Sequence, residues 1–164
     1  MQQPYEWVDV PETSGKMVMA RMPGQDEGSV DSFLEILEAI QPAAIVCLAS
    51  RDVIGEKSPA YAEALEADTL PVPVLECPLT RGGLPVDRQR FDALVRDVVD
   101  GVVAGKTYWV HAAGGTGHTG LFVGCVLKSV GVDELTVGDL LGPDEPVSDA
   151  QIEFLALYEP PPEG

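Results

Sequence analysis

One segment of the sequence, residues 108–120, has residue types and a spacing that suit the binding of an anion. A short apolar run is followed by Gly114, Gly115 and Gly117, three glycines within four positions. Glycine adopts backbone conformations that let successive N–H groups point toward one centre. A helix that begins directly after such a turn adds the positive end of its dipole. The segment therefore predicts a strand, an anion-binding turn and a helix, in that order.

The turn alone does not identify a ligand. No lysine follows its last glycine, as a Walker loop requires, and the glycine spacing differs from that of a dinucleotide fingerprint. A glycine-rich turn can also simply let a strand pack closely against its following helix. A structural role and an anion-binding role are therefore both open at this point.

The same segment resembles the signature loop of the protein tyrosine phosphatase superfamily, particularly its dual-specificity branch. The family pattern is His-Cys-x-x-Gly-x-x-Arg-Ser/Thr-Gly, and His111, Gly115, Thr119 and Gly120 match it. Residues 77–85 are similar to the general-acid loop of the family, and residues 148–155 to the segment that opens its closing helix. The three segments occur in the family's order. The resemblance implies a dual-specificity phosphatase fold over roughly residues 20–159.

The resemblance also implies three reacting positions, and each of them carries an unsuitable residue. Ala112 stands where the family has its cysteine nucleophile, so no covalent intermediate can form there. His118 replaces the arginine that clamps phosphate oxygens, and near its ordinary pKa of about 6.5 it is largely neutral at pH 7. Arg81 replaces the general-acid aspartate, and a guanidinium does not usefully release a proton. The sequence therefore predicts a pseudophosphatase.

We expect an anion-binding loop made of His111, Ala112, Ala113, Gly114, Gly115, Thr116, Gly117, His118 and Thr119. His111 is expected to orient this loop, and Thr119 either to donate to the anion or to cap the following helix. Arg81 and Gln151 are accessory candidates, Arg81 being interpreted either as a replacement positive charge or, more simply, as a solvated one. No metal-ligand cluster or cofactor motif is recognisable, and we expect neither a metal nor a cofactor.

Apolar runs predict the strands that position this loop. Residues 43–48, 72–75 and 108–110 are short and apolar, as expected for strands buried on both faces. Such runs alternate with segments of helical periodicity, a pattern typical of an α/β fold. We therefore predict a central, mostly parallel sheet flanked by helices.

Apolar residues at helical spacing predict the helices. One helix covers residues 30–40, with Ser29 as its cap, and another covers residues 86–104. Residues 121–130 are apolar nearly all round, which predicts a central buried helix. A last helix follows Ser148.

Length and composition limit the classes of function. The 164 residues suit a single domain over residues 1–159, followed by a proline-rich tail at residues 160–164. The 27 acidic and 10 basic residues give a net charge of −17, which disfavours binding to nucleic acid or to an anionic membrane. Each of the three cysteines lies in an apolar run, so we expect buried free thiols. No leader pattern or long apolar window is present, and we expect a cytoplasmic protein.

Three functions stay open on the sequence alone. The first is an inactive phosphatase-like module that binds a phosphorylated protein or a small anion. The second is a cysteine-dependent phosphatase, a phosphoric monoester hydrolase, whose nucleophile was replaced at Ala112. The third is an acidic interaction domain that binds a basic protein and does not use the old site.

Overall fold

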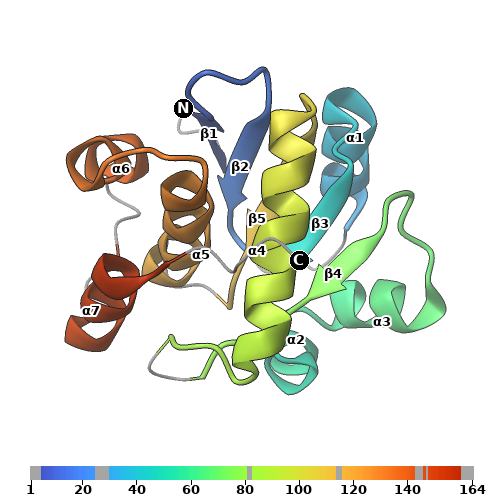
Figure 1. Cartoon of the computed structure of the whole chain (residues 1–164). Helices are drawn as coiled ribbons and strands as arrows, with labels where there is room; N and C mark the ends of the chain where they lie inside the picture. Colours follow the sequence, from blue (N-terminus) through green and yellow to red (C-terminus); the bar gives the residue numbers. More distant parts are fainter. Residues whose placement is uncertain are drawn as a thin grey trace.

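A five-stranded sheet in the order β1-β2-β5-β3-β4 forms the centre of the fold (Figure 1). The computed structural model describes residues 5–24, 30–80, 83–113, 116–142, 146 and 148–159. The strands are β1 (Tyr5–Asp9), β2 (Lys16–Ala20), β3 (Ala44–Cys47), β4 (Val74–Glu76) and β5 (Thr107–His111). Only β1 runs antiparallel to its neighbour, and the other three pairings are parallel. The predicted α/β class with a mostly parallel sheet is confirmed.

Helices cover both faces of this sheet. One face is covered by α4 (Arg88–Val103) and α5 (Thr116–Ser129), with α6 (Glu134–Leu141) and α7 (Asp149–Leu157) packed against α5. The other face carries α1 (Asp31–Ile40), α2 (Arg51–Lys57) and α3 (Pro59–Ala67). The apolar side chains of α5 from Leu121 to Leu127 are buried, as predicted for a central helix.

The strands have continuous apolar sequences because the sheet separates two hydrophobic cores. Successive side chains of a strand point to opposite faces. Val46 and Val110 belong to the core under α4 and α5, whereas Ile45 and Trp109 belong to the core under α1 and α3. All four residues of β3 are buried, so polar side chains are excluded from either face of it.

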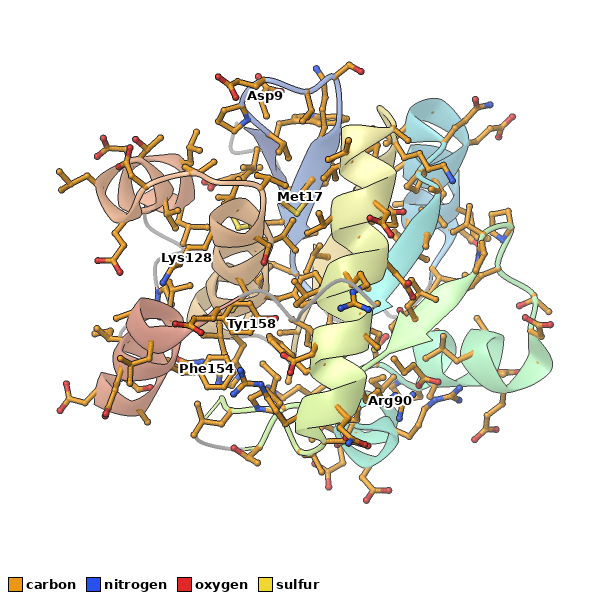
Figure 2. The ribbon with its side chains drawn as sticks, in the orientation of Figure 1. Asp9, Met17, Arg90, Lys128, Phe154 and Tyr158 are labelled. Atoms are coloured by element: carbon orange, nitrogen blue, oxygen red, sulfur yellow. The ribbon has the colours of Figure 1, made fainter. Side chains whose placement is uncertain are left out.

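An aromatic cluster fixes α7 to the rest of the fold. Phe91 of α4 makes edge contacts with Phe122, Phe154 and Tyr158, at centroid distances of 5.8, 5.7 and 6.1 Å. Figure 2 shows Phe154 and Tyr158 beside one another at the start of α4. The Arg88 guanidinium lies 4.7 Å from the Phe154 ring centroid, which adds a cation–π contact. This cluster packs the second half of α7 and its C-cap residue, Tyr158, against the first turns of α4.

Some element boundaries differ from the predicted ones, either because a proline lacks an N–H donor or because of the residue that stands at the helix cap. β4 begins at Val74 rather than two residues earlier, because Pro73 has no N–H to donate to the ladder. α4 begins after Asp87, whose carboxylate accepts a hydrogen bond of 3.1 Å from the Arg90 N–H. The N-cap position of α1 is Val30, which makes no side-chain capping bond; the predicted cap, Ser29, lies outside the described residues.

Two other expectations bear on the chain as a whole. Cys47, Cys77 and Cys125 are buried free thiols, as predicted. Within the described ranges, none of the helices has the length and apolar character needed to cross a membrane. The predicted tail at residues 160–164 lies outside the described residues, so its separation from the domain stays a prediction.

The carboxyl ends of the parallel strands meet along one edge, and the chain that leaves them stays hydrogen-bonded there. The Leu48 N–H donates to the His111 carbonyl at 3.0 Å. The Cys77 N–H donates to the Cys47 carbonyl at 2.9 Å, and the Leu79 N–H to the Leu48 carbonyl at 3.1 Å. Loops that leave β3, β4 and β5 are thereby held side by side at the edge where open α/β sheets bind ligands.

Candidate anion-binding site

The glycine-rich turn lies between the end of β5 and the start of α5. His111 ends the strand and Thr116 begins the helix, which is the predicted order of strand, turn and helix. Ala112 is buried, with 2% of its surface exposed. Gly114, Gly115 and the side chain of Thr116 lie outside the described residues. The backbone entering and leaving the turn therefore defines the site.

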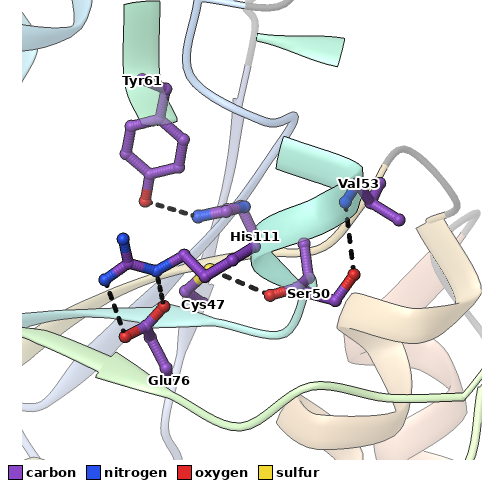
Figure 3. Close-up of polar contacts among 8 residues, drawn as sticks. Cys47, Ser50, Val53, Tyr61, Glu76 and His111 are labelled. Atoms are coloured by element: carbon purple, nitrogen blue, oxygen red, sulfur yellow. Dashed lines mark hydrogen bonds and ion pairs between the residues drawn. The ribbon is translucent and has the colours of Figure 1, made fainter. Parts of the chain in front are cut away.

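His111 is completely buried below the turn, and each of its ring nitrogens has a hydrogen-bond partner. Figure 3 shows the contact with Tyr61. Nε2 of His111 lies 2.7 Å from the Tyr61 hydroxyl, and Nδ1 lies 3.2 Å from the Ala112 carbonyl oxygen. Burial lowers the pKa of His111 to about 4 and raises that of Tyr61, so both groups are neutral at pH 7. The Tyr61 O–H then donates to Nε2, and the Nδ1–H donates to the Ala112 carbonyl.

This arrangement orients the first peptide group of the turn. A trans peptide group is planar, and its N–H points opposite to its C=O. Because the buried His111 ring holds the Ala112 carbonyl, the Ala113 N–H points away from that ring. A donor aimed away from the core at the entrance of the turn is what an anion nest requires.

A second polar contact holds the next carbonyl of the turn. The ammonium of Lys57, at the end of α2, donates to the Ala113 carbonyl oxygen at 3.0 Å. Sequence analysis did not single out Lys57, because 56 residues separate the two partners and only the fold brings them together. No motif in the sequence signals this contact.

Polar groups around the start of α2 are paired among themselves. Figure 3 shows Arg51 bound to Glu76 by two hydrogen bonds, one of them 3.1 Å between Nη2 and Oε2. Ser50 caps α2 by accepting a hydrogen bond of 3.3 Å from the Val53 N–H. The Arg51 charge is therefore balanced by a carboxylate beside it.

Cys47, at the end of β3, lies near the turn but is not an alternative nucleophile. Its Sγ lies 3.6 Å from the Ala49 carbonyl oxygen and is buried. Burial raises the pKa of this thiol to about 12, so the thiolate that nucleophilic attack needs is absent near pH 7.

His118 lies in the first turn of α5 and is half-buried. Burial lowers its pKa below the ordinary value of 6.5. The expectation of a pKa near that ordinary value is therefore corrected: the imidazole is neutral at pH 7 and gains its charge only in more acidic solution. At neutral pH His118 can offer an N–H donor, but no positive charge.

Three separate segments meet at Gly83. A Cβ built there would lie 2.7 Å from Cδ2 of His118 and 1.9 Å from Nε2 of Gln151, and the φ angle of +81° also favours glycine. Nε2 of Gln151 donates to the Gly83 carbonyl at 3.3 Å, and the Ser148 hydroxyl donates to Oε1 of Gln151 at 3.2 Å. The loop before α4, the start of α5 and the start of α7 are thus in contact.

The remaining predicted site residues are placed as follows. Because α5 begins at Thr116, Thr119 lies buried inside the helix and is not its N-cap, so the capping interpretation is wrong. Arg81 lies outside the described residues, so neither interpretation of its charge is tested. Among the described residues, no group of three or more His, Cys, Asp or Glu side chains is arranged to hold a metal ion.

The sequence matches no protein-family model and none of the curated proteins. Solved structures, in contrast, match over nearly the whole chain. The kinase associated phosphatase, with its catalytic-site cysteine substituted by serine, is 18% identical, has a TM-score of 0.78 and matches over 94% of both chains. Tk-PTP in its active form is 20% identical, with a TM-score of 0.67 over 95% of this chain and 96% of that one.

A third similar structure is the core catalytic domain of the PP-IP phosphatase SIW14 from S. cerevisiae in complex with citrate. It is 15% identical, with a TM-score of 0.61 over 96% of this chain and 86% of that one. At these identities the likeness concerns the fold. The chain therefore has the fold of the protein tyrosine and dual-specificity phosphatases.

Proposed function

We propose that this protein is a pseudophosphatase, a phosphatase-fold protein that binds a phosphorylated or other anionic group at residues 111–119 without hydrolysing it. The proposal rests mainly on the residue directly after β5. This residue is Ala112, whose side chain is a buried methyl group, and it stands at the position that matches the family's nucleophile. A methyl group has no lone pair, so it cannot attack phosphorus.

Among the described residues, the nucleophilic groups near the turn do not offer a replacement. The Cys47 thiol is buried and protonated, and both nitrogens of His111 are engaged by Tyr61 and Ala112. His118 lies on the flank of the turn, where it replaces the family's phosphate clamp rather than its nucleophile. Loss of the nucleophile in a serine protease lowers kcat on the order of a million-fold, which sets the scale expected here.

Binding, in contrast, needs only groups that the chain has kept. The Ala113 N–H points away from the core, α5 presents its N-terminus to the turn, and His118 adds a side-chain donor. The net charge of −17 repels ligands that are anionic throughout. We therefore propose a ligand with one anionic group on an otherwise neutral or basic body, either a phosphorylated protein segment or a small anion.

Hydrolysis of an aryl phosphate tests the proposal that the protein has no phosphatase activity. We expect no phosphate release by the wild type above the buffer rate, and none after Ala112→Cys alone, because the arginine clamp is still missing. The double variant Ala112→Cys/His118→Arg is the matched gain-of-function control. If Ala112→Cys alone hydrolyses the aryl phosphate through a trapped cysteine intermediate, the protein is a phosphatase whose nucleophile was replaced, and the proposal is wrong.

Thermal unfolding in the presence of tungstate or phosphate tests the proposal that the protein binds an anion. A ligand at about 100 times its Kd stabilises the native state by about 2.7 kcal/mol, which is readily measured as a rise in Tm. The contribution of His118 to this stabilisation should grow as the pH falls, because its imidazole gains a proton and with it a positive charge. Burial lowers the pKa of His118, so this growth is expected below pH 6.5. A Tm that does not respond to either anion between pH 5 and pH 8 would contradict the proposal.

A further inference from the structure

Lys57 occupies a fixed place beside the anion-binding turn. It is the last residue of α2, and the Ser58 N–H that follows closes the helix on the Ile54 carbonyl at 2.8 Å. The Ser58 hydroxyl is buried and donates to the Pro23 carbonyl at 2.7 Å. The backbone is therefore anchored at Ser58, directly after Lys57, and the exposed side chain of Lys57 reaches from that anchor to the Ala113 carbonyl.

Two successive carbonyls of the turn are bound by donors that come from outside it. The buried His111 ring binds the Ala112 carbonyl at 3.2 Å, and Lys57 binds the Ala113 carbonyl at 3.0 Å. Since the N–H of a peptide group points opposite to its C=O, the bound Ala112 carbonyl fixes the direction of the Ala113 N–H. The contact with Lys57 holds the next carbonyl, that of Ala113, at the entrance of the turn.

Lys57 also differs from the charged and titratable groups around it in what it contacts. Arg51 is bound to the Glu76 carboxylate, and His111 and His118 are neutral at pH 7 because burial lowers the pKa of each. The Lys57 ammonium donates instead to a neutral carbonyl, so this contact does not cancel its charge. An ammonium beside the turn offsets, locally, a chain charge of −17 that otherwise repels anions.

We propose that Lys57 belongs to the anion site: it holds the Ala113 carbonyl at the entrance of the turn and supplies positive charge for a bound oxyanion. This inference rests on the proposed function and adds a positioning residue that no segment of the phosphatase resemblance contains. In this chain the positive charge that attracts the anion then comes from Lys57 at the end of α2, because His118 on α5 is neutral at pH 7.

The test is isothermal titration of sodium tungstate into the wild type and two variants, Lys57→Gln and Lys57→Arg. Lys106→Gln is the matched control, because Lys106 is an exposed lysine just before β5, at the opposite edge of the sheet. We expect Lys57→Gln to weaken tungstate binding about three- to fivefold, the upper part of the range for an exposed charge. Lys57→Arg, which keeps the charge and a donor, should stay within about twofold of the wild type, and so should Lys106→Gln.

Repeating the titration at several salt concentrations separates a positioning and charge role from a merely structural one. The slope of log Kd against log salt should be smaller for Lys57→Gln than for Lys106→Gln, whereas the Tm values without ligand should agree. Equal affinities for Lys57→Gln and Lys106→Gln would overturn the role of Lys57 and leave the proposed function intact. Absence of tungstate binding by the wild type would overturn both.

Discussion

The buried side and the open side of the turn after β5 are built differently. On the buried side Tyr61 and His111 lie in one hydrogen-bonded chain, with a contact of 2.7 Å between them, and the ring is completely excluded from water. On the side that faces a ligand, which we call the open side, Ala112 has only a methyl group and is itself 2% exposed, and the half-buried His118 has a neutral ring. Burial and hydrogen bonds hold the turn in place regardless of whether the open side can perform a reaction.

This difference separates the support of the turn from any chemistry at its open side. An unpaired polar group on the buried side would cost free energy of folding, so the Tyr61–His111 pair is maintained by stability alone. The comparison leads to four predictions, in order of decreasing effect. They test whether buried contacts stabilise the turn and whether that stabilisation is independent of ligand binding.

The largest effect is expected from the pH dependence that His111 contributes to stability. Its pKa is about 4 in the folded protein and about 6.5 in the unfolded chain, so between these values only the unfolded chain takes up the proton. The free energy of unfolding should fall by about 3 kcal/mol from this group as the pH drops from 7 to 4. Urea unfolding at a series of pH values measures this fall.

A His111→Gln variant is the reference for that measurement, since it cannot titrate. The wild-type curve minus the variant curve should slope downward with falling pH below 6.5 and level off near pH 4. Parallel curves over this range would show that His111 is not held neutral by burial.

The next largest effect is expected from Tyr61→Phe. The substitution removes the hydroxyl that donates to His111 and leaves a buried ring nitrogen without a partner. The free energy of unfolding should fall by about 2 kcal/mol, the usual penalty for an unsatisfied buried group. Tyr158→Phe is the control, because it removes a hydroxyl whose hydrogen bond to Asp92 is only part-buried and does not involve the turn. A loss no greater than that of Tyr158→Phe would contradict the role assigned to Tyr61.

Gly83→Ala should break the contact among the three segments. Its Cβ would overlap Gln151 and approach His118, in addition to the strain of an L-residue at φ +81°. Gly131→Ala is a matched control, because Gly131 has φ +97° but nothing within 4 Å of the added Cβ. We expect a loss of about 1 kcal/mol at Gly131 from backbone strain and a clearly larger loss at Gly83. Equal losses in thermal unfolding would show that the segments do not meet there.

The smallest effect is expected from Gly55→Ala, and it is stabilising. Gly55 lies within α2, is exposed, and an added Cβ would meet nothing within 4 Å. Alanine should raise the free energy of unfolding by about 1 kcal/mol through its higher helix propensity. Tungstate affinity should not change, because the added methyl touches neither Lys57 nor the turn. A change in affinity would mean that α2 must move for an anion to bind.

The central fold could be predicted from the sequence, because the apolar patterns of its long elements are unambiguous. The runs that became β3 and β5 are buried on both faces, and the periodic segment that became α4 has one buried side. Residues 51–67 received no prediction, since α2 is only seven residues long and contains Gly55, and α3 follows it directly at Pro59. The hairpin of β1 and β2 was not predicted either.

Only those parts of the candidate site that belong to recognisable sequence segments were predicted. The turn, and Gln151 as an accessory residue, were expected from segments in a familiar order, but the contact of Gln151 with the loop before α4 was not. Tyr61 and Lys57 were not, because they lie 50 and 56 residues from their partners in the sequence. The lowered pKa of His118 was missed for the same reason: burial depends on what packs against a residue in three dimensions.

The central claim is that the open side of the turn binds an oxyanion, and backbone amide NMR during a phosphate titration tests it most directly. The account predicts saturable shifts of the amides of Ala112, Ala113 and Thr119 and the segment between them, with the amides of β1 and α6 unaffected. Shifts that do not saturate, or that spread over the surface and leave residues 111–119 unchanged, would contradict the account.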